Sequence, residues 1–235
     1  MLNVLVACEE SQAVCKAFRA LGHRAFSCDL QECSGGHPEW HIQGDALAVI
    51  NGNCTFVTAD GCWHSQVGKW DLLIAHPPCT FISNAGARFL YPKGVLNEER
   101  LRKGIEATHF FMAFYYADCD HIAVENPVPS SVYMLPPYTQ AIQPYHFGVP
   151  LKKKTCLWLK GLPLLCPTNL LDQEDCQSTK IPGNWFNHGG KERQKNRAKT
   201  FPEVAEAMAV QWSEYLEKKE NYDVVADYMQ YKLFE

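Results

Sequence analysis

The sequence lacks the features that mark several common classes of protein. No apolar run reaches the roughly 20 residues of a membrane helix, and the start, Met1-Leu2-Asn3-Val4, has no basic leader. There are eleven cysteines, and an odd number without a leader argues against a disulfide framework. We therefore expect a cytoplasmic protein with reduced thiols, in a bacterial or phage-infected cell, and no contact with a membrane.

A metal site is also poorly supported by the sequence. No Cys-x-x-Cys pair occurs anywhere in the chain. Cys33, His37 and His41 are spaced by four, and Cys62 and His64 lie further along. Histidines in loops are usually solvated, so we expect no metal, and zinc is the weaker interpretation.

Positive charge is not in excess. The net charge is −4, whereas proteins dedicated to duplex DNA usually carry a basic face. A local patch is still compatible with this average. The basic run from Lys191 to Lys199 could contact phosphates or could be a solvated loop.

The pattern that is present is that of an alternating α/β protein. Strands are expected at 2–7, 24–28, 70–75, 121–124 and 155–159, and helices at 11–21, 97–117 and 202–218. This alternation favours a doubly wound, mainly parallel sheet with helices on both faces. We expect one domain over residues 1–235, in which residues 160–197 form a short loop-rich insertion.

Polar or reactive side chains follow four of the expected strands. Ligands of doubly wound sheets bind at the carboxyl ends of the strands, so these side chains are expected to form one site. In chain order the four groups are Cys8-Glu9-Glu10-Ser11, Asp29, Pro77-Pro78-Cys79 and Glu125-Asn126-Pro127.

The acid at the end of the second strand points to a nucleoside cofactor. Asp29 could accept two hydrogen bonds from a ribose diol, or it could cap a turn. The first turn contains no glycine, so the dinucleotide fingerprint is missing and NAD is not expected.

Cys79 and Glu125 suit one reaction on a pyrimidine. Two prolines fix the backbone before Cys79, and Asn126-Pro127 follow Glu125. A cysteine thiolate can add to carbon 6 of the ring while a carboxylic acid hydrogen-bonds the ring nitrogen, and carbon 5 then becomes nucleophilic enough to take a methyl group. Alternatively, Cys79 could be a small core residue and Glu125 could pair with a lysine.

The order of these motifs resembles the C5-cytosine DNA methyltransferase family, particularly its short phage-type members. Pro78-Cys79 matches the family's Pro-Cys motif, Glu125-Asn126 its Glu-Asn motif, and Gly44-Asp45 its Gly-Asp motif near the cofactor adenine. Asp29 matches the ribose-binding acid. The resemblance implies a Rossmann-like methyltransferase fold, S-adenosylmethionine as cofactor, and methyl transfer to carbon 5 of cytosine in DNA.

The resemblance extends to the rest of the implied site. The segment from Phe147 to Thr155 resembles the one that carries the family's arginine pair, with Lys153 and Thr155 as the nearest matches, and Phe201 to Ala209 resembles its closing helix. The implied catalytic residues are Cys79, Glu125, Pro78, Asn126 and Lys153, and the implied cofactor-binding residues are Cys8, Glu9, Ser11, Asp29, Asp45, Pro77 and Thr200.

Three departures from the family's pattern bear on these expectations. The glycine-rich first loop is replaced by Ala7 to Gln12, where Glu9 and Glu10 would repel a cofactor carboxylate but could hold its amino group. Lysine in place of arginine loses the bidentate fork. The segment from Lys160 to Arg197 is short for a separate target-recognition domain.

These departures keep two other functions open. One is modification of a cytosine nucleotide or a short single strand, which the acidic charge and the short recognition segment favour. The other is a non-catalytic relative that binds nucleic acid or cofactor, which the unusual first loop favours. The partner is therefore expected to be duplex DNA, single-stranded DNA or a cytosine nucleotide, and a homodimer is possible.

Overall fold

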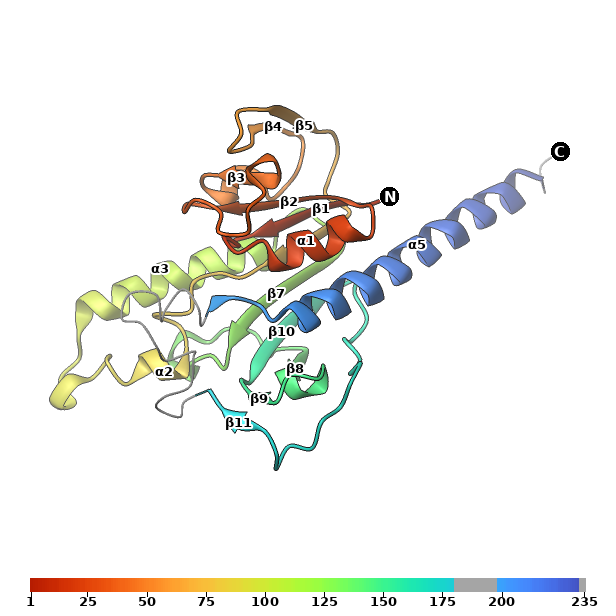
Figure 1. The fold of residues 1–235 in the computed structure, drawn as a ribbon. Coiled ribbons are helices and arrows are strands. Elements are labelled where there is room, and N and C mark those ends of the chain that lie inside the picture. The colour runs from red at the N-terminus through yellow and green to blue at the C-terminus, as the bar shows by residue number, and fades with distance from the viewer. Residues whose placement is uncertain (180–197, 233–235) are drawn as a thin grey trace.

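A seven-stranded sheet forms the centre of the molecule (Figure 1). The structure is a computed structural model, and it describes residues 1–179 and 198–232. The strand order is β3-β2-β1-β6-β7-β10-β8. The strands are β1 (Asn3–Ala7), β2 (Arg24–Asp29), β3 (His41–Gln43), β6 (Leu72–Ala75), β7 (Ile122–Pro127), β8 (Gln140–Ile142) and β10 (Thr155–Lys160).

The sheet confirms the predicted fold class. Strands β3, β2, β1, β6 and β7 run parallel to one another, and β10 lies antiparallel between β7 and β8. The order of the parallel part is that of a doubly wound sheet, in which the chain turns outward in both directions from β1. This arrangement is consistent with the Rossmann-like methyltransferase fold.

The central strands are buried on both faces, which explains their continuous apolar sequences. Val4, Leu5 and Val6 of β1 have no exposed surface, and neither does any residue of β6. One face of the sheet is covered by α1 (Ala13–Ala20) and α5 (Pro202–Lys232), which lie side by side. The other face is covered by α3 (Glu98–Tyr115).

The smaller elements were not predicted from the sequence. A separate hairpin is formed by β4 (Cys54–Val57) and β5 (Trp63–Gln66), and β9 (Leu151–Lys152) pairs with β11 (Gln177–Ser178). The short helices are η1 (Pro38–Trp40), η2 (Ala46–Ala48), α2 (Asn84–Ala87), η3 (Pro92–Gly94), η4 (Ser131–Tyr133) and η5 (Pro144–His146).

The structure tests the predicted closing helix, but it describes only part of the predicted insertion. The closing helix starts at Pro202 as predicted but continues to Lys232, and its end projects away from the sheet (Figure 1). The insertion at 160–197 is described as far as Thr179, and the basic run at 191–199 falls mostly outside the described residues. Among the residues that the structure describes, no helix combines the length and the apolar character needed to cross a membrane.

Candidate active site

A carboxylate in the turn between β1 and α1 caps the N-terminus of α1. Cys8 and Gln12 both adopt the left-handed conformation, with φ of 59° and 58°. This places the carboxylate of Glu9 over the start of α1, where it accepts hydrogen bonds from the backbone N–H groups of Val14 (2.7 Å) and Cys15 (3.1 Å). A helix N-terminus has unpaired N–H groups and favours negative charge, so this contact stabilises α1.

The capping contact changes the interpretation of Glu9. Its side chain is 4% exposed, and both of its oxygens are hydrogen-bonded to the helix. Burial raises the pKa of Glu9, and the nearby His76 and the two N–H donors offset part of that rise. Glu9 therefore caps α1, and its predicted contact with the amino group of a cofactor stays a prediction.

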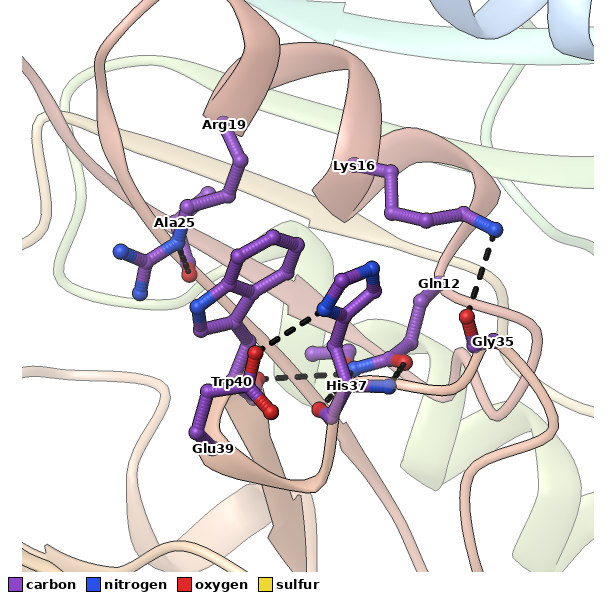
Figure 2. Close-up of polar contacts among 9 residues, drawn as sticks. Gln12, Lys16, Arg19, Ala25, Gly35, His37, Glu39 and Trp40 are labelled. Atoms are coloured by element: carbon purple, nitrogen blue, oxygen red, sulfur yellow. Dashed lines mark hydrogen bonds and ion pairs between the residues drawn. The ribbon is translucent and has the colours of Figure 1, made fainter.

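The segment after β2 crosses the same turn and closes it on one side (Figure 2). The Gln12 side chain donates to the carbonyl of His37 (2.8 Å) and accepts from the His37 N–H (3.0 Å). Ser34 N donates to the Glu10 carbonyl at 2.8 Å. A Cβ at Gly35 would lie 2.6 Å from the Ser11 carbonyl, so only glycine fits this approach. Ser11 therefore faces the crossing segment.

The histidines in this region have structural partners. The rings of His37 and Trp40 stack at 3.8 Å, and the guanidinium of Arg19 lies 5.0 Å from the Trp40 ring (Figure 2). His41 is fully buried, with its two ring nitrogens bonded to Ser27 Oγ and to the Gln31 carbonyl. In the described part of the chain, no three His, Cys, Asp or Glu side chains come together in a way that could hold a metal ion.

Asp29 and Asp45 form an acidic group at the carboxyl ends of β2 and β3. Asp29 Oδ1 accepts from the Gln31 N–H at 2.9 Å, and Asp45 Oδ1 accepts from the Leu47 N–H at 3.0 Å. Besides burial, the negative charges of both carboxylates raise the pKa values of the Cys8 and Cys28 thiols. Burial, followed by the charges of Asp29 and Asp45, raises the pKa of Cys28 to about 12, and burial together with the same charges raises the pKa of Cys8 even further. Both thiols are therefore neutral and poor nucleophiles.

This acidic group fits the ribose end of S-adenosylmethionine. Each aspartate uses one oxygen, Oδ1, to fix its own turn, and Oδ2 of Asp29 accepts no hydrogen bond from the described residues. A carboxylate in this position at the end of the second strand can accept the hydroxyl groups of a ribose. At the N-terminus of α1, by contrast, the N–H groups of Val14 and Cys15 are already bonded to Glu9.

Hydrogen bonds join the loop after β6 to the end of β7 and to the residues that follow β7. Asn126 Nδ2 donates to the Pro77 carbonyl at 2.7 Å, and this contact is buried. Two backbone bonds continue the attachment, from Asn84 N to the Val128 carbonyl (3.0 Å) and from Ser130 N to the Ile82 carbonyl (2.8 Å). Cys79 is half-buried within this loop, and Pro78 beside it is exposed. The loop that bears the Pro-Cys motif is therefore bonded to the strand that bears the Glu-Asn motif.

A buried ionic cluster lies beside this loop. His76 Nδ1 is 2.9 Å from Glu125 Oε2, and the two side chains are only 9% and 13% exposed. Burial alone would lower the pKa of His76, but the bond to Glu125 and the charges of Glu125 and Glu9 raise it. Burial alone would raise the pKa of Glu125, but His76 and Lys153 lower it. Each partner therefore favours the charged form of the other.

Glu125 also faces a recess between β10 and α5. Lys153 lies at its edge, with Nζ 3.5 Å from the Lys199 carbonyl and 5.6 Å from the centre of the Phe201 ring. The recess therefore brings together three residues predicted for the site, Glu125, Lys153 and Thr200. It is lined by Glu125, Ile142, Pro144, Lys153, Thr155, Thr200, Phe201, Val204 and Met208.

The predicted site residues thus occupy two adjoining regions of one sheet edge. The predicted catalytic residues gather at the ends of β6 and β7 and before β10. Of those predicted for the cofactor, Cys8, Asp29 and Asp45 lie around the ends of β1, β2 and β3, whereas Pro77 and Thr200 lie on the catalytic side. His76 was given no role from the sequence. Its position directly after an expected strand was the signal that could have identified it.

Comparisons with known proteins find likeness among solved structures only. No protein-family model matches this chain, and no curated protein matches it significantly. The chain is similar to a solved structure from E. coli, a candidate DNA modification methyltransferase encoded within a prophage, with a TM-score of 0.41 and 14% identity. The alignment covers 73% of this chain and 52% of that one, so the chain spans about half the length of that protein.

Proposed function

We propose that this chain transfers a methyl group from S-adenosylmethionine to carbon 5 of cytosine in DNA, through a covalent bond to Cys79. The observation that carries this proposal is the buried hydrogen bond from Asn126 to the Pro77 carbonyl. This bond links the loop that bears Cys79 to the strand that bears Glu125. A nucleophile and an acid for one pyrimidine ring are thereby held at the same edge of the sheet.

In the proposed reaction each residue has a definite task. The Cys79 sulfur adds to carbon 6 of cytosine, and the electron pair moves toward the ring nitrogen, where Glu125 hydrogen-bonds the base. Asn126 keeps the cysteine loop in place during this step, because a small displacement of a reacting group is costly to the rate. Bound S-adenosylmethionine would supply the methyl group that carbon 5 accepts.

The cofactor assignment predicts a measurable role for Asp29. Asp29→Ala should weaken S-adenosylmethionine binding by about 1–3 kcal/mol, because a ribose hydroxyl pair would lose its charged acceptor. Isothermal titration calorimetry measures this directly. Asp120→Ala is a matched control, since Asp120 is exposed and precedes β7 at the opposite edge of the sheet. Equal affinities for Asp29→Ala and the native protein would place the cofactor elsewhere.

The product of the reaction tests the proposed function itself. Mass spectrometry of nucleosides from the DNA of cells that express the protein should show 5-methylcytosine above the level in cells without it. Methylation on the exocyclic nitrogen of cytosine or on adenine would refute the assignment to carbon 5. Methylation of free dCMP but not of DNA would favour the nucleotide-modifying alternative.

A further inference from the structure

His76 lies at the centre of the buried cluster, but the proposed reaction gives it no task. It follows β6, the strand that lies between β1 and β7 in the sheet. Its Nδ1 is bonded to Glu125, while its Nε2 is buried and has no hydrogen-bond partner among the described residues. Such unpartnered buried polar atoms are rare in proteins and need an explanation.

Three charged side chains from three different elements act on His76. Glu9 faces it from the turn after β1, Glu125 from β7 and Lys153 from the chain before β10. The imidazole thus has two carboxylates and one cation among its charged neighbours. The negative charges of Glu9 and Glu125 favour a proton on His76, even though burial opposes it.

This arrangement creates a difficulty for the proposed reaction. An unprotonated ring nitrogen is an acceptor, so Glu125 must carry a proton to donate a hydrogen bond to it. The pKa of Glu125 is lowered and that of His76 is raised, so their mutual contact favours the proton on His76 over Glu125. His76 Nδ1, the atom that would hold the proton the reaction needs, is 2.9 Å from Glu125 Oε2.

We propose that His76 is a positioning residue that holds Glu125 and stores the proton that Glu125 passes to the ring nitrogen of the substrate base. The proposal rests on the proposed function. As the thiolate of Cys79 bonds to carbon 6, the proton of His76 Nδ1 moves to Glu125 Oε2 and from there to the ring nitrogen. Carbon 5 then takes the methyl group and loses its own proton to solvent water. The carbon–sulfur bond breaks, the thiolate leaves, and the ring nitrogen returns its proton through Glu125 to His76.

The surroundings of His76 suit a group that changes its protonation state. Glu125 is the one hydrogen-bonding partner of the imidazole in the described structure, so no second partner competes for the Nδ1 proton. Both oxygens of Glu9 are bonded to backbone N–H groups at the start of α1. Glu9 acts on His76 through its charge.

The first test needs neither cofactor nor substrate. In an NMR titration of the isotope-labelled protein, the imidazole of His76 should titrate above 6.5, the ordinary histidine value, and should move down in Glu125→Gln. His109, which is exposed on α3, provides an internal reference signal in both proteins. A His76 pKa at or below 6.5 in the native protein would overturn the proposal.

The second test separates proton storage from a purely structural role. His76→Asn keeps an N–H donor for Glu125 but has no titratable proton, and it should slow covalent capture of a 5-fluorocytosine oligonucleotide by about 10- to 100-fold. The native capture rate should fall as the pH rises through the pKa of His76, and this fall should be absent in His76→Asn. His109→Asn is the matched control and should retain the native profile.

The outcomes distinguish the inference from the function on which it rests. If the native protein captures no oligonucleotide, the covalent reaction on cytosine fails, and this assignment of His76 fails with it. If the native protein captures the oligonucleotide and His76→Asn retains the native rate and pH profile, the inference alone is wrong. Should His76→Asn not fold, the titration of His76 in Glu125→Gln still decides whether the two groups share a proton.

Discussion

Replacement of Cys79 by serine is expected to abolish covalent capture of a 5-fluorocytosine oligonucleotide and to reduce methyl transfer by at least about three orders of magnitude. A serine hydroxyl is a far weaker nucleophile than a thiolate, so the addition to carbon 6 would fail. The change conserves size, and the loop is held by its backbone and by Asn126, so the fold should be retained. Capture is measured by the shift of the protein band in denaturing electrophoresis.

The other cysteines allow a sharp control for this prediction. Cys62 and Cys166 are exposed, and Cys62→Ser and Cys166→Ser should capture the oligonucleotide as the native protein does. Cys8 is the strongest rival because it lies near the same sheet edge, but burial and two aspartates raise its pKa and keep the thiol neutral. Normal capture by Cys79→Ser, or its loss in Cys8→Ser alone, would show that the mechanism is wrong.

Glu125→Gln is expected to lower turnover by about 10²- to 10⁴-fold while leaving the affinity for S-adenosylmethionine unchanged. Glutamine can still accept a hydrogen bond from His76, but it cannot pass a proton to the base. The predicted cofactor contacts at Asp29 and Asp45 lie at the other end of the site, beyond β1. Single-turnover kinetics and calorimetry measure the two quantities separately.

The same substitution at an exposed glutamate serves as the control for Glu125→Gln. Glu99 is an exposed glutamate of α3, and Glu99→Gln should leave both turnover and cofactor affinity at native values. A parallel loss of cofactor affinity in Glu125→Gln would mean that the residue contacts the cofactor. Unchanged turnover would remove Glu125 from the chemistry altogether.

The sequence predicted the central part of the fold because burial leaves a strong signal there. Strands β1 and β6 are apolar at almost every position, and α3 and α5 are long enough for their caps and periodicity to be visible. The edge strands β3 and β8 have three residues each and carry no comparable pattern. They form because neighbouring strands provide partners, which is information that a local stretch of sequence does not contain.

For the candidate site, the sequence predicted where residues lie but not which side chains they contact. The strand-end argument placed Cys79, Glu125 and Asp29 at one edge of the sheet, and the structure has them at that edge. It could not show that Glu9 turns back onto α1, because that depends on left-handed backbone at Cys8 and Gln12. The partnership of His76 with Glu125 was equally hidden, since it joins residues on two strands that only the sheet brings together. The catalytic and cofactor roles stay predictions.

The packing of α5 against α1 has a consequence for how the protein is made. Val14 and Phe18 of α1 have no exposed surface and belong to the same apolar cluster as Met208 and Trp212 of α5. On the ribosome, α1 is synthesised long before its covering helix, because α1 ends at Ala20 and α5 begins at Pro202. The apolar side of α1 must therefore stay exposed, or be shielded by a chaperone, until α5 has emerged. Premature termination before Phe201 would leave that surface permanently open and the truncated product prone to aggregation.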